Sequence, residues 1–223
     1  MALGKTPKND KPAREIGPSR IANTGYVAGS DGHVAIESYL EASFLYLLRF
    51  DPEVESFKTQ ALTIPWTDED GKSRKYTPDI LVHYKSGPPE LIEVKHTALL
   101  SRDREVLEKK FSAAQAYTQD KGWVFRLVTE DDIPEMLVIN YRFLDRYRKS
   151  GLLPDSGISD RILSVLPVGV TTTPKALLEL LCASDDAKAL YLPYLWQLVA
   201  TGEIYCDLSA RITMSSTIRL ART

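Results

Sequence analysis

The sequence predicts an α/β core followed by a small, mostly helical second domain. Across residues 32–149, short apolar runs of strand character alternate with longer segments whose apolar residues recur at helical spacing. The resulting order of helix, strands, helix, strand and helix is typical of a central mixed sheet flanked by helices. The Gly-, Pro- and Ser-rich segment 150–157 then indicates a linker, and residues 158–223 form the expected second domain.

Composition narrows the class of protein. The chain has 223 residues, enough for a core domain and a small partner domain, and its net charge of −2 means that any nucleic-acid contact must come from local basic clusters. The two cysteines, Cys182 and Cys206, are too few for a disulfide framework or a zinc finger. Because no apolar run could span a membrane and no secretory signal is evident, we expect a cytoplasmic protein without membrane contact.

The N-terminal residues predict a basic arm, and the residues after it predict regular helices and strands. Residues 1–31 contain five basic side chains among Pro, Gly, Ser and Asn, and we expect a flexible basic arm. From 34 to 50, apolar residues recur at helical spacing and predict an amphipathic helix that ends near Asp51-Pro52, with Glu37 and Glu41 beside the apolar stripe. Strands are expected at 57–66, 76–84, 91–95 and 123–128, with helices at 101–120 and 135–149.

Charged residues at the ends of two of these strands form a pattern with chemical meaning. Thr77-Pro78-Asp79 opens one strand, and Glu93 and Lys95, two residues apart, share a face of the next. Carboxylate oxygens suit Mg²⁺ or Mn²⁺, and a lysine beside the metal can orient or deprotonate a water for attack on phosphorus. The PD…(D/E)-x-K pattern therefore predicts a restriction-endonuclease-like nuclease core.

The pattern alone is weak, because charges at strand ends are usually solvated. Its context supports it: the two strands form a hairpin, a helix with carboxylates precedes them, and a helical crossover follows. Glu41 would supply a further carboxylate from the first helix, and Glu37, one turn earlier, is the alternative.

The second domain has a recognisable order of elements. Three helices are expected: one at 158–166, a second that begins at Thr173-Pro174, and a third that ends at Thr201-Gly202. Strands are expected after them at 203–208 and 212–220. Three helices and a terminal hairpin predict a winged helix. Because the third helix contains no Arg, we expect this domain to dock on proteins rather than read bases, although Arg211, Arg219 and Arg222 would let the wing touch phosphates.

Several stretches together resemble the TnsA endonuclease subunit of heteromeric transposases, a group that includes transposons with CRISPR guides. The similarity extends over essentially the whole chain, except that the basic arm carries no motif of the family. Its most specific stretch is residues 38–54, followed by 57–60. Residues 77–79 and 93–95 match the acidic and lysine positions of the family, and residues 107–109 resemble the helix that follows.

The resemblance implies the site residues. It places the catalytic glutamate on Glu41 rather than Glu37, and it implies a catalytic set of Glu41, Asp79, Glu93 and Lys95, with Lys95 positioning the attacking water. The implied Mg²⁺ ligands, with Mn²⁺ as a substitute, are Glu41, Asp79, Glu93 and Val94. Some members of the family carry glutamine at the position of Glu93.

The implied activity is hydrolysis of the non-transferred strand at the 5′ ends of a transposon. Double-stranded DNA at transposon ends, a TnsB-like transposase and a TnsC-like AAA+ ATPase regulator are the implied partners. Two alternatives stay open: a stand-alone restriction or junction-resolving nuclease, and a non-catalytic adaptor that joins transposase and regulator.

Overall fold

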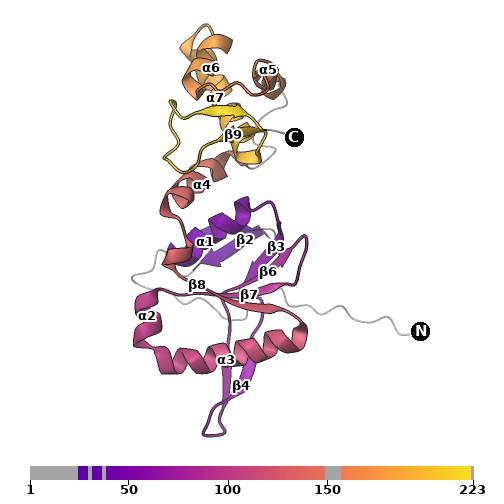
Figure 1. Cartoon of the computed structure of the whole chain (residues 1–223), viewed down its shortest axis with the longest axis vertical. Coiled ribbons are helices and arrows are strands. Elements are labelled where there is room, and N and C mark those ends of the chain that lie inside the picture. The colour runs from indigo at the N-terminus through magenta and orange to yellow at the C-terminus, as the bar shows by residue number, and fades with distance from the viewer. Residues whose placement is uncertain (1–24, 30–31, 37–38, 149–156, 222–223) are drawn as a thin grey trace, which may run out of the picture. The chain divides into compact units, whose positions relative to one another are not determined.

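The computed structural model describes residues 25–29, 32–36, 39–148 and 157–221 (Figure 1). The expected arm at 1–31 falls mostly outside these residues, as does nearly all of the expected linker. The chain divides into two compact units, Met1–Ile133 and Pro134–Thr223. Within the described part of the chain, no helix is both long and apolar enough to cross a bilayer.

The first unit is built on a four-stranded mixed sheet, as predicted. Its strand order is β3-β6-β7-β8, in which β7 and β8 run parallel and the other neighbours run antiparallel. The pairing places β6 and β7 in the centre of the sheet, so each of the two strands next to the predicted site residues has a hydrogen-bonded neighbour on both sides. The bounds are Val54–Thr59 for β3, Ile80–Tyr84 for β6, Glu90–Val94 for β7 and Val124–Val128 for β8.

A helical crossover joins the parallel strands β7 and β8, because parallel neighbours cannot be linked by a tight turn (Figure 1). The expected single helix is divided into α2, Thr97–Arg102, and α3, Arg104–Lys121, with Asp103 between them. Helix α3 ends at Gly122, whose positive φ of 68° and backbone N–H bonds to the preceding turn close the helix.

Helix α1, Tyr39–Phe50, covers the sheet through an apolar stripe that includes Phe44, Leu45 and Leu48. Leu45 is fully buried, as are Val82 of β6 and Ile92 of β7. The predicted amphipathic helix is therefore confirmed from Tyr39 onward, and its first turn carries Glu41.

The start of that helix differs from the prediction. Strand β2, Gly32–Ile36, pairs antiparallel with β1, Gly25–Gly29, where the sequence analysis expected the end of the arm and the first helical turns. Val34 and Ile36 are β-branched and favour extended backbone. They fit the helical spacing equally well, which is why the local pattern misplaced this boundary.

Two expected strands are each interrupted. Strands β4, Ile64–Thr67, and β5, Ser73–Tyr76, form a separate antiparallel hairpin. Gln60, with φ of 48°, turns the chain after β3. Pro78, which has no N–H to donate, lies in the break between β5 and β6. Asp79 consequently stands immediately before β6.

The second unit contains four helices and a two-stranded antiparallel sheet among its described residues. The predicted helix ends are confirmed: the Thr173 hydroxyl accepts the Ala176 N–H at 3.1 Å, and Gly202 closes the last helix with φ of 89°. The strands are shorter than expected. The elements are α4 Glu135–Arg148, α5 Ile158–Ser164, α6 Pro174–Leu181, α7 Asp185–Thr201, β9 Ile204–Cys206 and β10 Ile218–Leu220.

Helix α4 belongs to the second unit, whereas the sequence analysis assigned residues 135–149 to the core domain. Asn140, 1% exposed, donates to the carbonyls of Leu208 and Ala210 at 3.0 and 2.8 Å and accepts the Ile212 N–H at 3.0 Å. Phe143 also packs edge-on against Trp196, with ring centroids 5.3 Å apart. The division between the units therefore falls before α4 rather than after it.

Candidate active site

Asp79 is fixed at the start of β6 by bonds to both its side chain and its main chain. It is 7% exposed, and its Oδ2 accepts the Val94 N–H at 2.8 Å. Its carbonyl oxygen accepts the Gln60 N–H at 2.7 Å, and the hydroxyls of Thr63 and Thr77, in the segments that lead to β4 and β6, lie 2.9 Å apart. The carboxylate is therefore held against the end of β7 in one orientation.

Glu93 and Lys95 meet at the end of β7. The Lys95 Nζ lies 3.1 Å from Glu93 Oε1, and the Tyr76 hydroxyl donates to Glu93 Oε2 at 2.9 Å. Glu93 is 4% exposed, and the Lys95 N–H donates to the Val128 carbonyl at 2.9 Å. Each oxygen of the Glu93 carboxylate thus has its own donor, and Lys95 extends the parallel pairing with β8 by one residue.

The carboxylates of this site act on one another. Burial raises the pKa of Asp79 well above its usual value, and Glu93 and Glu41 raise it further, against the opposing effects of Lys95 and the Val94 N–H. Burial would lower the pKa of Lys95, but the charges of Glu93, Asp79 and Glu41 outweigh it and the pKa is raised. The site therefore collects negative charge around a lysine that stays protonated.

Glu41 enters this cluster through its charge. It lies half-buried in the first turn of α1 and perturbs both Asp79 and Lys95. Its alternative, Glu37, lies outside the described residues. Among the residues that the structure describes, no three His, Cys, Asp or Glu side chains form a group able to hold a metal ion. Asp79 and Glu93 are thus the buried carboxylates of the site, and Glu41 acts on Asp79 and Lys95 through its charge.

Comparison with known families agrees with this geometry. Residues 51–130 match the model of a family described as TnsA-like endonuclease N terminal. Residues 51–130 are therefore similar to a TnsA-like endonuclease domain. The matched segment of this TnsA-like domain includes Asp79, Glu93 and Lys95, whereas Glu41 precedes it. The comparison with curated proteins gave no match.

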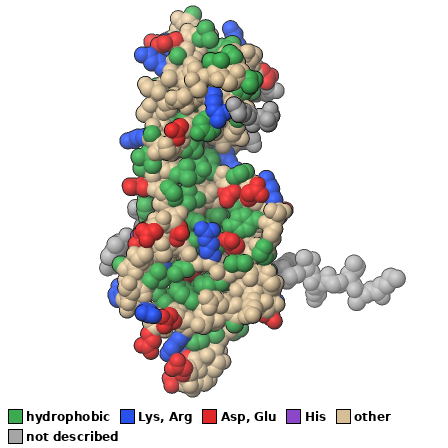
Figure 2. Space-filling model, in the orientation of Figure 1, with side chains coloured by type: hydrophobic (Ala, Val, Ile, Leu, Met, Phe, Trp, Pro, Cys, Tyr) green, Lys and Arg blue, Asp and Glu red, His purple; other side chains and the backbone are tan. Residues whose placement is uncertain are grey.

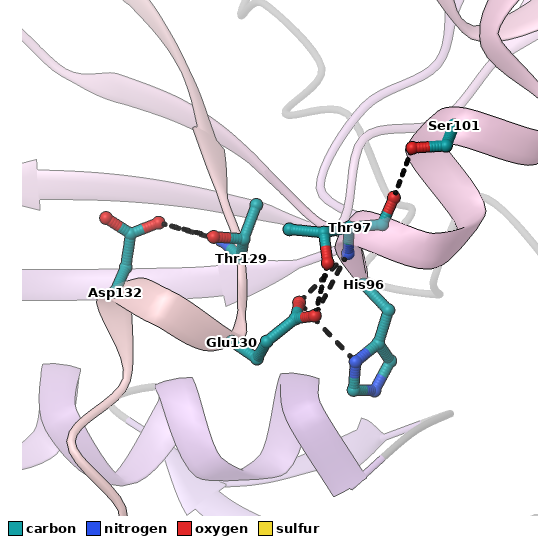
Figure 3. Close-up of polar contacts among 6 residues, drawn as sticks. All are labelled: His96, Thr97, Ser101, Thr129, Glu130 and Asp132. Atoms are coloured by element: carbon teal, nitrogen blue, oxygen red, sulfur yellow. Dashed lines mark hydrogen bonds and ion pairs between the residues drawn. The ribbon is translucent and has the colours of Figure 1, made fainter.

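The Glu130 carboxylate secures the segment after Lys95 (Figure 3). The Glu130 side chain accepts the Thr97 N–H at 2.9 Å and the Thr97 hydroxyl at 2.6 Å, and His96 Nδ1 lies 3.5 Å away. The Thr97 hydroxyl and N–H bonds, with the backbone at Glu130, lower the pKa of Glu130 to about 2. These contacts tie the start of α2 to the end of β8 within the TnsA-like domain.

The segment around Glu130 carries one local sequence signal, a capping box. Thr129 and Asp132 form a capping box, in which the Thr129 N–H donates to Asp132 Oδ2 at 2.8 Å. The spacing is visible in the sequence, but the partner of Glu130 is not, because Thr97 lies 33 residues away. Tyr76 is the other side chain that sequence reasoning missed, since its contact with Glu93 depends on the hairpin.

Lys109 pairs with acidic side chains of its own helix and of the β4–β5 hairpin. It lies 3.7 Å from Glu105 and 3.3 Å from Glu69 of the β4–β5 turn, and Arg74 pairs with Asp68 at 2.8 Å. Figure 2 shows acidic and basic side chains interspersed around the β4–β5 hairpin and α3. Among the described residues around this hairpin and α3, acidic side chains therefore interrupt the basic ones, so they form no continuous basic surface of the kind that tracks DNA phosphates.

Proposed function

We propose that the protein is a metal-dependent DNA endonuclease subunit of a transposase, which hydrolyses the non-transferred strand at the 5′ ends of a transposon. One observation carries the proposal: the buried carboxylates of Asp79 and Glu93 converge with the half-buried Lys95 inside the segment that matches the TnsA-like family. The family match supports a nuclease related to a transposase subunit. The convergence supports a metal-assisted mechanism.

The donor set fits Mg²⁺, with Mn²⁺ as a substitute. Mg²⁺ in phosphoryl-transfer sites commonly takes one or two carboxylates and fills its remaining positions with water and substrate phosphate. Asp79 and Glu93 would be the direct ligands, the main-chain carbonyl of Val94 a third, and Glu41 the outer carboxylate. When bound, the cation would polarise the scissile phosphate and stabilise the charge of the transition state.

The protein groups around that position have separable roles. Asp79 and Glu93 present negative charge that is already oriented, so little reorganisation is needed when a cation enters. Lys95 is protonated at neutral pH because its pKa is raised. Of the two roles considered for it, we therefore favour donation: its ammonium would orient the attacking water and stabilise charge on the phosphate oxygens, and it would not remove a proton.

We further propose that the second unit is a winged helix that docks on partners, with α5, α6 and α7 as its three helices and β9–β10 as its wing. Helix α7 contains no Arg, which speaks against base reading. Leu180 and Leu190 are 71% and 57% exposed and support contact with protein. A TnsB-like transposase and a TnsC-like regulator are the proposed partners.

A nicking assay on end-labelled transposon-end DNA tests the proposal. The full chain would be incubated with Mg²⁺ in the presence and absence of the two partner proteins, and the cut strand would be mapped. We expect 5′-end cuts only with the partners, and none with Asp79→Asn, which keeps the side-chain shape and an oxygen for the Val94 N–H.

The other outcomes identify the alternatives. Vigorous cutting by the chain alone would indicate a stand-alone nuclease. Assembly with both partners, without cutting in Mg²⁺ or Mn²⁺, would indicate a non-catalytic adaptor and would contradict the proposed function.

A further inference from the structure

We propose that Tyr76 is a positioning residue of this site, whose hydroxyl holds the Glu93 carboxylate in the orientation that binds the divalent cation. The proposal rests on the metal-dependent nuclease function inferred above. The Tyr76 hydroxyl donates to Glu93 Oε2 at 2.9 Å, and Lys95 engages the other oxygen at 3.1 Å. With a donor at each oxygen, the carboxylate cannot rotate freely about its last side-chain torsion, which is otherwise broad.

The tyrosine ring is itself held in place by the core. Tyr76 is 5% exposed and belongs to a buried cluster with Ile64, Leu91 and Ala114. Leu91 lies two residues before Glu93 on β7, so both side chains leave the same face of the strand. The ring therefore packs on Leu91 while its hydroxyl reaches the neighbouring carboxylate, and the β4–β5 hairpin fixes its backbone through pairing with Ile64.

The chemistry of the donor explains why a tyrosine suits this position. A phenol carries no charge at neutral pH, and the Tyr76 hydroxyl donates its proton to Glu93 Oε2. A second lysine would hold the carboxylate equally well, but it would also cancel the charge that attracts the cation. A neutral donor orients the ligand and leaves its charge intact, as partners of metal ligands commonly do.

Tyr76→Phe tests this role, because phenylalanine fills the same space without the hydroxyl. Mn²⁺ binding to the full chain would be measured by electron paramagnetic resonance, and cutting in the presence of the partner proteins would be measured against Mn²⁺ concentration. We expect the Kd for Mn²⁺ and the half-saturating Mn²⁺ concentration for cutting both to rise by about 10–100-fold, which is the usual loss of affinity when a partner of a metal ligand is removed. Excess Mn²⁺ should recover most of the maximal rate.

Tyr84→Phe is a matched control. Tyr84, the last residue of β6, also donates its hydroxyl to a glutamate of β7, Glu90 Oε2 at 3.0 Å, but Glu90 is not part of the site. The control should lose a comparable hydrogen bond and bind Mn²⁺ as the wild type does. Equal weakening in both variants would assign the effect to the sheet in general and overturn the proposal.

A double-mutant cycle with Glu93→Gln separates the outcomes further. If Tyr76 acts through Glu93, Tyr76→Phe should cause no additional loss of Mn²⁺ affinity in the Glu93→Gln background. If a folded Tyr76→Phe protein bound Mn²⁺ with wild-type affinity, the role proposed for Tyr76 would be overturned, but the proposed nuclease function would not. Absence of Mn²⁺ binding in the wild type would instead overturn both this role and the metal dependence of the proposed function.

Discussion

Replacing Lys95 by methionine should destabilise the TnsA-like domain while no divalent cation is present. Methionine keeps much of the length and apolar stem of lysine but removes the ammonium. Glu93 would then retain the Tyr76 hydroxyl and lose its ion pair at 3.1 Å. Asp79 and Glu41 would lose the same compensating charge, because both act on Lys95 electrostatically.

The expected magnitude follows from burial. Removing one partner of a buried ion pair costs about 3–5 kcal/mol, because the other charge stays buried and uncompensated. The Lys95 side chain is 28% exposed and that of Glu93 5%, so solvent screens part of the interaction. We therefore expect a loss of about 2–4 kcal/mol at pH 8. The loss should shrink as pH falls, because Asp79, whose pKa is raised, takes up a proton early.

Native-state hydrogen exchange of the β6 and β7 amides would report this local stability without assuming that the two units unfold together. Lys95→Arg is the control, since it keeps a positive charge and should cost much less. Added Mn²⁺, at a free concentration of 100 times its Kd, should raise the free energy of unfolding of the Lys95→Met variant by about 2.7 kcal/mol. If Lys95→Met were as stable as the wild type at pH 8, Lys95 could not be the cation that balances the buried carboxylates.

Three further predictions concern stability. Asn140→Ala should lower the free energy of unfolding of the second unit by about 3–5 kcal/mol, because it leaves three backbone groups without their partner. Hydrogen exchange of the amides at 204–220 should become faster. Leu45→Ala should cost about 2–5 kcal/mol in the first unit, as measured by urea unfolding, because the side chain is fully buried. The Glu130 contact should be fully present above pH 4.5 and disappear as pH falls toward 2, since its folded pKa is depressed, and the Thr97 amide shift in NMR should follow that titration.

Each of these has a matched control or a contrary result. Leu190→Ala, at a 57% exposed position, should change stability by less than about 0.5 kcal/mol, in contrast to Leu45→Ala. Unchanged exchange at 204–220 in Asn140→Ala would show that the loop does not depend on this side chain. Glu130→Gln should remove the pH dependence of the Thr97 amide, and a titration that persists in this variant must belong to another group.

The parts of the fold that the sequence predicts are those with strong local patterns. The mixed sheet, the helical crossover and the caps at Thr173 and Gly202 follow from periodicity and from residue types with one dominant use. Short segments are ambiguous for the same reason: Val34 and Ile36 fit a helix and a strand equally well. The breaks at Gln60 and Pro78 divide apolar runs that look continuous by residue type.

The site is predictable only in part. Asp79, Glu93 and Lys95 are recognised by their spacing, because strand geometry brings them together. The Tyr76 and Glu130 contacts join residues that are 17 and 33 positions apart, and they depend on how the hairpin and the crossover pack. The assignment of α4 to the second unit has the same origin: it is decided by Asn140 and Phe143 contacts with partners far along the chain.

The central position of β6 and β7 affects how the protein would lose activity on heating. Edge strands of a sheet fray first, because one side of each lacks a partner strand, whereas inner strands open only when their neighbours do. Among the described strands of this sheet, β3 and β8 are the edges. Partial melting would therefore spare the positions of Asp79 and Glu93 relative to one another. Loss of the proposed cutting activity should track cooperative unfolding of the whole domain, so we expect heat inactivation over a narrow temperature range.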